Sequence, residues 1–164
     1  MTAKPTPNQT TMQVDSERTI VITRSFDARA ATVFEAWTSA ALVKRWWAPK
    51  SHGVSVVSCE ADVRVGGKYR YVLRHPGGDI AFSGEYREVT PPTRLVYTQV
   101  FEPMADADAV VVTLTLEEHG GKTRMVATEV YPSREAREAA LSSGMEHGMR
   151  ETLEQLDELV ASLP

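Results

Sequence analysis

The sequence predicts an α+β fold in which a curved antiparallel sheet of about seven strands grips a long C-terminal helix. Three observations support this prediction: a series of β-branched stretches separated by short turns, two short helical segments after the first strand, and an apolar stripe of helical period near the C-terminus. Short turns favour antiparallel neighbours, because parallel strands need long crossovers. One amphipathic helix can cover one face of such a sheet.

The expected strands are bounded by residues that favour turns. Glycine pairs and proline-containing pairs separate most of them, as at Gly66-Gly67, Pro91-Pro92 and Gly120-Gly121. Gly66, Gly67 and Gly84 would also allow the sheet to bend. The expected strands cover residues 19–26, 54–60, 68–74, 80–89, 94–101, 109–117 and 123–131.

Three helices are expected. Two are short, over residues 30–37 and 40–46, and the third runs as one helix over about residues 133–162. Ser133 is the expected N-cap of the long helix, with Glu135 in its first turn. Its apolar stripe follows a spacing of four, four, four, three and four residues, through Leu141, Met145, Met149, Leu153, Leu156 and Val160.

Length and composition indicate one domain and exclude several classes of partner. The 164 residues suit a single domain, expected over residues 17–163, after a flexible, polar tail over residues 1–16. A formal net charge of -4 is atypical of nucleic-acid-binding proteins. No apolar run is long enough for a membrane span, the first residues do not resemble a secretion signal, and the single cysteine, Cys59, implies no oxidising compartment. A cytoplasmic location is therefore expected.

Five motifs, in order, carry a resemblance that extends over nearly the whole folded part. The chain resembles a stand-alone domain of the activator of heat-shock-protein-90 ATPase homologue family, a branch of the START-like (SRPBCC) superfamily. The motifs are Trp46-Trp47-Ala48-Pro49, residues 62–71 with their Gly-Gly pair, residues 84–86 followed by 91–98, Gly120-Gly121-Lys122-Thr123, and residues 144–157.

The resemblance implies a helix-grip fold, like that of the major birch pollen allergen and the polyketide cyclases. It does not imply one activity, because this fold hosts carriers, receptors, cyclases and co-chaperone domains. The family's founding co-chaperone joins such a domain to a separate chaperone-binding domain. We expect no second domain of that kind in 164 residues, so a chaperone interaction is not supported by one.

The sequence shows no catalytic constellation. His52, His75, His119 and His147 have no metal-ligand spacing and are expected at the surface. Nucleophile-elbow, phosphate-loop and dinucleotide motifs are absent from the sequence. We therefore predict no catalytic residue, no metal and no cofactor, and an enzyme is not the favoured interpretation.

The stronger candidates are residues on the inward faces of strands and helix that could line a cavity. Each tyrosine among them either packs in the core with a satisfied hydroxyl or presents a polar group to a ligand. Glu129 either reaches the surface, where it could pair with an arginine, or is an acid of the cavity. The candidates are Trp47, Tyr69, Tyr71, Phe82, Tyr86, Tyr97, Gln99, Phe101, Met125, Glu129, Met145, Met149 and Leu153.

Three functions remain open at this stage. The leading hypothesis is a carrier or sensor that binds a small hydrophobic or amphipathic molecule between sheet and helix. The second is a cyclase-like or hydrolase-like enzyme that uses Glu129 or a tyrosine of the same cavity. The third is a co-chaperone-type interaction module, with a homodimer as a possible assembly.

Overall fold

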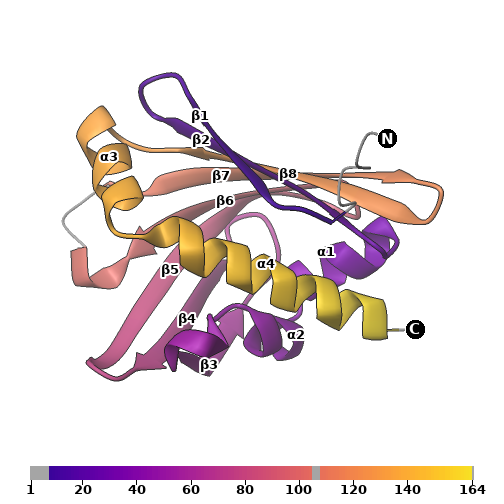
Figure 1. Cartoon of the computed structure of the whole chain (residues 1–164), viewed down its shortest axis with the longest axis horizontal. Coiled ribbons are helices and arrows are strands. Elements are labelled where there is room, and N and C mark those ends of the chain that lie inside the picture. The colour runs from indigo at the N-terminus through magenta and orange to yellow at the C-terminus, as the bar shows by residue number, and fades with distance from the viewer. Residues whose placement is uncertain (1–7, 105–107, 164) are drawn as a thin grey trace, which may run out of the picture.

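The fold was analysed in a computed structural model, which describes residues 8–104 and 108–163. The described part is one antiparallel sheet with helices on one side of it, and α4 crosses that side (Figure 1). In chain order the elements are β1 (Thr11–Asp15), β2 (Thr19–Phe26), α1 (Ala30–Thr38), α2 (Ala40–Trp46), the 3-10 helix η1 (Lys50–His52), β3 (Ser55–Ala61), β4 (Lys68–His75), β5 (Gly78–Thr90), β6 (Arg94–Phe101), the 3-10 helix η2 (Glu102–Met104), β7 (Val110–His119), β8 (Lys122–Val130), α3 (Arg134–Ser142) and α4 (Met145–Ser162).

The sheet has eight strands, in the order β1-β2-β8-β7-β6-β5-β4-β3. This arrangement confirms the predicted helix-grip fold, with one strand more than expected. The additional strand is β1, which pairs antiparallel with β2 from Thr11 to Asp15. The prediction of a flexible tail is wrong for these five residues, and residues 1–7 of that tail lie outside the described part. Four of the five residues of β1 are exposed, which is why no apolar alternation revealed an edge strand there.

The C-terminal helix is interrupted, contrary to the single helix expected. Helix α3 ends at Ser142 and α4 begins at Met145, with Gly144 between them at a φ of 80°. Glycine adopts this left-handed conformation without the steric cost that a Cβ would bring. The predicted N-cap is confirmed: the Ser133 hydroxyl oxygen accepts a hydrogen bond from the Ala136 N–H at 3.0 Å.

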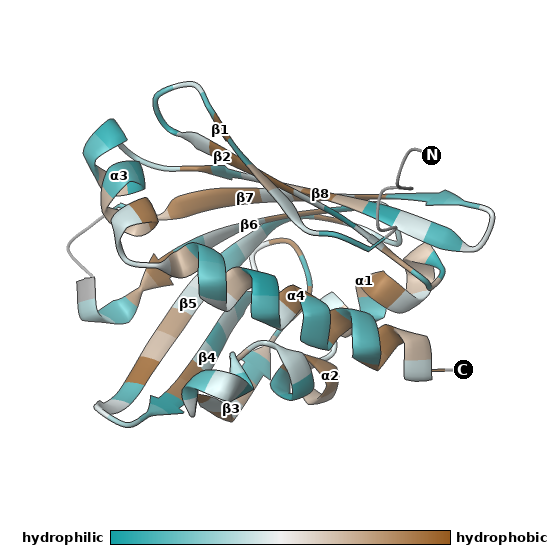
Figure 2. Ribbon diagram, in the orientation of Figure 1, coloured by the Kyte–Doolittle hydropathy of each residue, from teal (hydrophilic) through white to brown (hydrophobic). Residues whose placement is uncertain are grey.

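Helix α4 is amphipathic and lies with its apolar side on the sheet. Figure 2 shows polar and apolar residues alternating along it. Leu153, Leu156, Leu159 and Val160 are buried, and the helix contacts α1, α2 and β2. Burial of these side chains is the main force that holds the helix on the sheet, at about 1.5–3 kcal/mol for each fully buried aliphatic side chain.

An ion pair adds a specific contact between sheet and helix. Inward positions of β2 carry Ile20, Ile22 and Phe26, but also Arg24, which is 5% exposed. Its guanidinium lies 3.1 Å from the Asp157 carboxylate on α4 and donates to the Thr10 hydroxyl at 2.7 Å. The anionic partner and the hydrogen-bond acceptor compensate for much of the solvation that a buried arginine loses. Arg24 therefore fixes where α4 docks.

The middle of the sheet brings two strands unusually close together. A Cβ at Gly84 of β5 would lie 1.8 Å from the Thr98 carbonyl oxygen of β6. The same carbonyl accepts a hydrogen bond from the Tyr69 hydroxyl at 2.6 Å. Only glycine permits this approach, so Gly84 is needed where the sheet curves around the helix.

Candidate ligand-binding pocket

A pocket of about 240 Å³ lies between the sheet and α4. We call it the central pocket. The sheet provides its floor, α4 its roof, and the end of α1 with the Trp46–Pro49 turn one side wall. Its lining residues are Ile22, Trp37, Trp46, Trp47, Pro49, Leu73, Phe82, Tyr97, Gln99, Val112, Met125, Ala127, Glu129, Met145, Gly148, Met149, Thr152 and Leu153.

Nine of the thirteen residues proposed from sequence lie around this pocket. Period-two alternation along β5, β6 and β8, and the helical stripe of α4, turn them toward the same space. They are Trp47, Phe82, Tyr97, Gln99, Met125, Glu129, Met145, Met149 and Leu153. Their position makes them candidates for contact with a ligand.

Three of the predicted tyrosines belong to the packed core instead. Tyr69, Tyr71 and Tyr86 are at most 6% exposed and surround a void of only about 10 Å³ beside the central pocket. The Tyr69 ring lies 4.9 Å from the Tyr71 ring and 5.5 Å from the Tyr86 ring, centroid to centroid. These side chains fill the curved end of the sheet, where little room is left for a ligand.

Phe101 is also placed differently from the prediction. It is 37% exposed and is not among the residues that line the central pocket. Phe101 of β6 pairs with Phe82 of β5, and their ring centroids are 5.1 Å apart. It lies beyond Gln99, which is the last residue of β6 that pairs with β7. The alternation of β6 is correct, but the strand extends past the covered part of the sheet.

Several residues that line the pocket were not predicted from the sequence, above all Trp37 and Trp46. All three tryptophans of the chain line the pocket: Trp37 at the end of α1, and Trp46 and Trp47 at the end of α2. The Trp46 indole N–H donates to the Ala36 carbonyl at 2.9 Å, which holds α2 against α1. Adjacent residues on a helix point in different directions, so only the turn after α2 brings both Trp46 and Trp47 to the pocket.

Trp37 borders the pocket and carries a buried donor without a partner among the described residues. Its ring packs edge-on against Trp46, with centroids 4.7 Å apart. Its indole N–H is buried and has no hydrogen-bond partner among the described residues. A buried donor left without an acceptor costs about 1–3 kcal/mol. The Trp37 ring borders the pocket, while this N–H is enclosed by protein atoms.

Among the described residues, Glu129 is the only carboxylate that lines the pocket. One of its oxygens accepts a hydrogen bond from the Tyr131 hydroxyl at 2.9 Å. Glu129 is surrounded by protein but is only partly buried, because its side chain faces the pocket. Burial raises the pKa of its carboxyl group above the usual 4.5, and the Tyr131 hydrogen bond offsets part of that rise. Of the two alternatives, the structure therefore favours a cavity acid.

Tyr97 is the second titratable group of the pocket. Burial raises the pKa of its phenol above the usual value, and the Glu129 carboxylate adds to the rise. Tyr97 is therefore a neutral hydroxyl at ordinary pH, able to donate or accept a hydrogen bond.

Other chemistry finds little support in the described residues. In residues 8–104 and 108–163 no cluster of His, Cys, Asp and Glu has the arrangement of a metal site. Burial raises the pKa of the Cys59 thiol to about 11, which disfavours the reactive thiolate. Among the helices described, none is long and apolar enough to cross a membrane.

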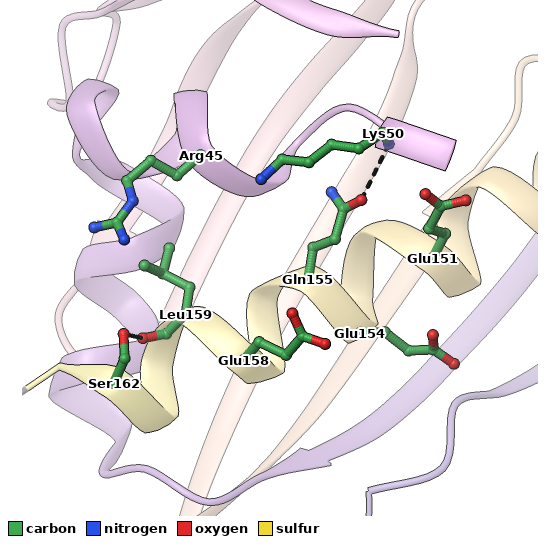
Figure 3. Close-up of a pocket in the computed structure, with 8 residues that line it drawn as sticks. All are labelled: Arg45, Lys50, Glu151, Glu154, Gln155, Glu158, Leu159 and Ser162. Carbon is green, nitrogen blue, oxygen red and sulfur yellow. Dashed lines mark hydrogen bonds between the residues drawn. The ribbon is translucent and has the colours of Figure 1, made fainter. Parts of the chain in front are cut away.

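A second hollow, of about 440 Å³, lies between α2, η1 and α4. We call it the lateral groove (Figure 3); it is lined by Arg45, Lys50, Glu151, Glu154, Gln155, Glu158, Leu159 and Ser162. Gln155 donates to the carbonyls of Trp46 and Ala48, at 2.9 and 2.7 Å, and accepts from the Lys50 N–H at 3.1 Å. At this groove, the hydrogen bonds of Gln155 hold α4 against the turn after α2.

Solved structures similar to this chain include several bacterial proteins. One from Rhodobacter sphaeroides is 27% identical, with a TM-score of 0.86 over 94% of this chain and 100% of that one. One from Staphylococcus epidermidis is 29% identical, with a TM-score of 0.78 over 92% and 93% of the two chains.

An HSP90 activator from Plasmodium falciparum shares the fold at 19% identity, with a TM-score of 0.64 over 88% of this chain and 96% of that one. No curated protein matches the chain in sequence. The family model described as "Activator of Hsp90 ATPase homolog 1-like protein" matches residues 27–161, from the end of β2 almost to the end of α4. That span contains every residue of the central pocket except Ile22. The chain therefore belongs to the Activator of Hsp90 ATPase homolog 1-like family.

Proposed function

We propose that this protein binds a small amphipathic molecule in the central pocket, as a carrier or sensor. The observation that carries the proposal is a pocket with mostly apolar walls that a few polar residues also line: Tyr97, Gln99, Glu129 and Thr152. Ligand sites in proteins typically combine an apolar lining with a small number of placed polar groups.

The roof of the pocket suits a ligand of variable shape. Met145 and Met149 of α4 face the space together with Met125 of β8. Methionine side chains are flexible and polarisable, so they adapt to irregular apolar surfaces. We therefore infer that the pocket tolerates variation in the apolar part of a ligand and selects through its polar groups.

Native mass spectrometry of protein purified from its own host tests the proposal. The expected result is a bound small molecule that is lost on mild denaturation. Two matched variants each introduce one leucine, on opposite sides of α4. Gly148→Leu fills the pocket, since a Cβ there meets only the Pro49 ring at 3.8 Å, and should remove the molecule. Glu154→Leu, on the outer side, should keep it.

A retained molecule in Gly148→Leu, or none in the wild-type protein, would contradict the proposal. Both variants must show the wild-type circular dichroism spectrum for the comparison to hold.

An Hsp90 activator-type module is the second candidate, favoured by the family match. Among described residues, the large exposed apolar side chains are Val14 of β1, Val65 in the turn before β4 and Phe101 of β6, whereas many interfaces carry a contiguous apolar patch. Stimulation of an Hsp90 ATPase by the wild-type protein, retained in Gly148→Leu, would favour this candidate over ligand binding.

The enzyme hypothesis has a narrower basis. Glu129 lines the pocket, and burial raises the pKa of its carboxyl group, as a general acid would need. Turnover of any bound molecule that survives Glu129→Gln would remove this assignment. A cytoplasmic location and a homodimer stay predictions from the sequence.

A further inference from the structure

The central pocket carries an unbalanced set of charged groups. Glu129 is its one carboxylate, and none of the described residues that line it is a lysine, arginine or histidine. An anionic head group would therefore enter an apolar space beside Glu129 without a cation to pair with it. Charges interact more strongly in such a space than in water, so this imbalance should determine which ligands bind.

The walls around Glu129 favour the opposite charge. Trp37, Trp47, Phe82 and Tyr97 line the same pocket, and Trp47 lies 5.0 Å from Phe82, centroid to centroid. Aromatic ring faces attract ammonium groups, most strongly those of tryptophan and when water is excluded. An aromatic wall with one carboxylate is a chemical environment suited to an amine.

Hydrogen-bonding capacity remains at Glu129. The Tyr131 hydroxyl donates to one Glu129 oxygen, and a carboxylate can accept about four hydrogen bonds. An ammonium donor would use the acceptor sites that remain.

We propose that the central pocket selects small amphipathic amines over the corresponding alcohols and carboxylates. This selectivity rests on the proposed ligand-binding function. An ammonium ion pairs directly with the ionised Glu129 carboxylate. With protonated Glu129, a neutral amine takes the proton: the O–H bond breaks, an N–H bond forms, and the same ammonium–carboxylate pair results. An ammonium ion that meets protonated Glu129 releases the Glu129 proton to solvent. The other titratable groups facing Glu129 are the phenols of Tyr97 and Tyr131.

The test uses octylamine, 1-octanol and octanoate, which share one apolar chain and differ in head group. Fluorescence of Trp37, Trp46 and Trp47 reports binding, since all three line the pocket. At neutral pH we expect octylamine to bind the wild-type protein at least about tenfold more tightly than octanol, and octanoate at least about tenfold more weakly than octanol. Gly148→Leu should abolish binding of octylamine, which excludes simple attraction to an acidic surface.

Two matched variants assign the selectivity to one carboxylate. Glu129→Gln should bring octylamine and octanol to within about threefold of each other and improve octanoate. Glu154→Gln removes the same charge from the outer side of α4 and should keep the wild-type ranking. If Glu129→Gln does not fold, the ranking of the three probes in the wild-type protein decides.

The outcomes separate the two proposals. Octanol binding without a preference for octylamine, or a preference that survives Glu129→Gln, overturns the selectivity and leaves the ligand-binding function standing. Failure of all three probes to bind overturns both.

Discussion

The two hollows beside α4 differ in what their polar groups do. In the lateral groove, Gln155 bonds to three backbone groups, and Glu151 accepts from the Ser51 N–H at 2.7 Å. In the central pocket, the Glu129 carboxyl has one hydrogen-bond partner among described residues, the Tyr131 hydroxyl. Polar groups bonded to the backbone hold a fold together, whereas a carboxyl group with unused acceptor capacity can also bond to a ligand. The larger hollow is thus the structural one.

The largest expected effect is the loss of stability when a leucine is replaced by alanine, which should differ between the two hollows. Leu153→Ala, in the roof of the central pocket, should lower the free energy of unfolding by about 3 kcal/mol, because a buried leucine is replaced by a cavity. Leu159→Ala, beside the lateral groove, should cost about 1–2 kcal/mol, because water can enter the space among charged side chains. Urea denaturation of both variants measures the difference. Equal losses would mean that the two hollows are equally dry.

The second prediction tests the structural role of the groove. Gln155→Ala leaves the Trp46 and Ala48 carbonyls and the Lys50 N–H without their side-chain partner, and should cost about 2 kcal/mol. Glu154→Ala, one residue away, should change stability by less than about 0.5 kcal/mol, because it breaks no such contact. Thermal unfolding of the two variants provides the comparison. Unchanged stability of Gln155→Ala would show that the hydrogen bonds of Gln155 contribute nothing to stability.

The third and smallest effect concerns pH. The unfolded chain releases the Glu129 proton near pH 4.5, but burial raises the pKa of this group in the folded protein. Between these two values the folded state binds more protons, so wild-type stability falls as pH rises and levels off above the raised pKa. Glu129→Gln lacks this dependence while keeping an acceptor for Tyr131. Its stability relative to wild type should therefore grow as pH rises above 4.5 and level off above the raised pKa.

Denaturant titrations over that pH range measure the gain. If the stability of Glu129→Gln relative to wild type fell with rising pH, the folded protein would stabilise the Glu129 carboxylate, contrary to the effect expected from burial.

Local pattern predicted most of the fold. The strands 19–26 and 94–101 and the helix 40–46 have the predicted bounds, because alternation and turn residues act over a few positions. The break at Gly144 was missed because the apolar stripe continues across it from Leu141 to Met145. Arg24 gave no signal either, since its partner Asp157 lies 133 residues away in sequence.

The site was harder to predict, because period two identifies a face of the sheet and not a place on it. Tyr71 and Tyr97 both point inward, yet one packs in the aromatic core and the other borders the pocket. Phe101 shares the face of Tyr97 and lies outside both. Only the position of α4 and of the three tryptophans separates these cases, and that position depends on contacts between distant parts of the chain.

Methyl NMR of methionine tests the central claim most directly. Met125, Met145 and Met149 line the central pocket, whereas Met12 lies on edge strand β1 and lines neither hollow. With methyl-labelled protein and octanol as the probe, we expect saturable shifts of the three pocket methyls, ligand-to-methyl nuclear Overhauser effects, and an unchanged Met12 signal. Shifts of Met12 alone, or no saturable shift of any pocket methyl, would contradict a ligand site beneath α4.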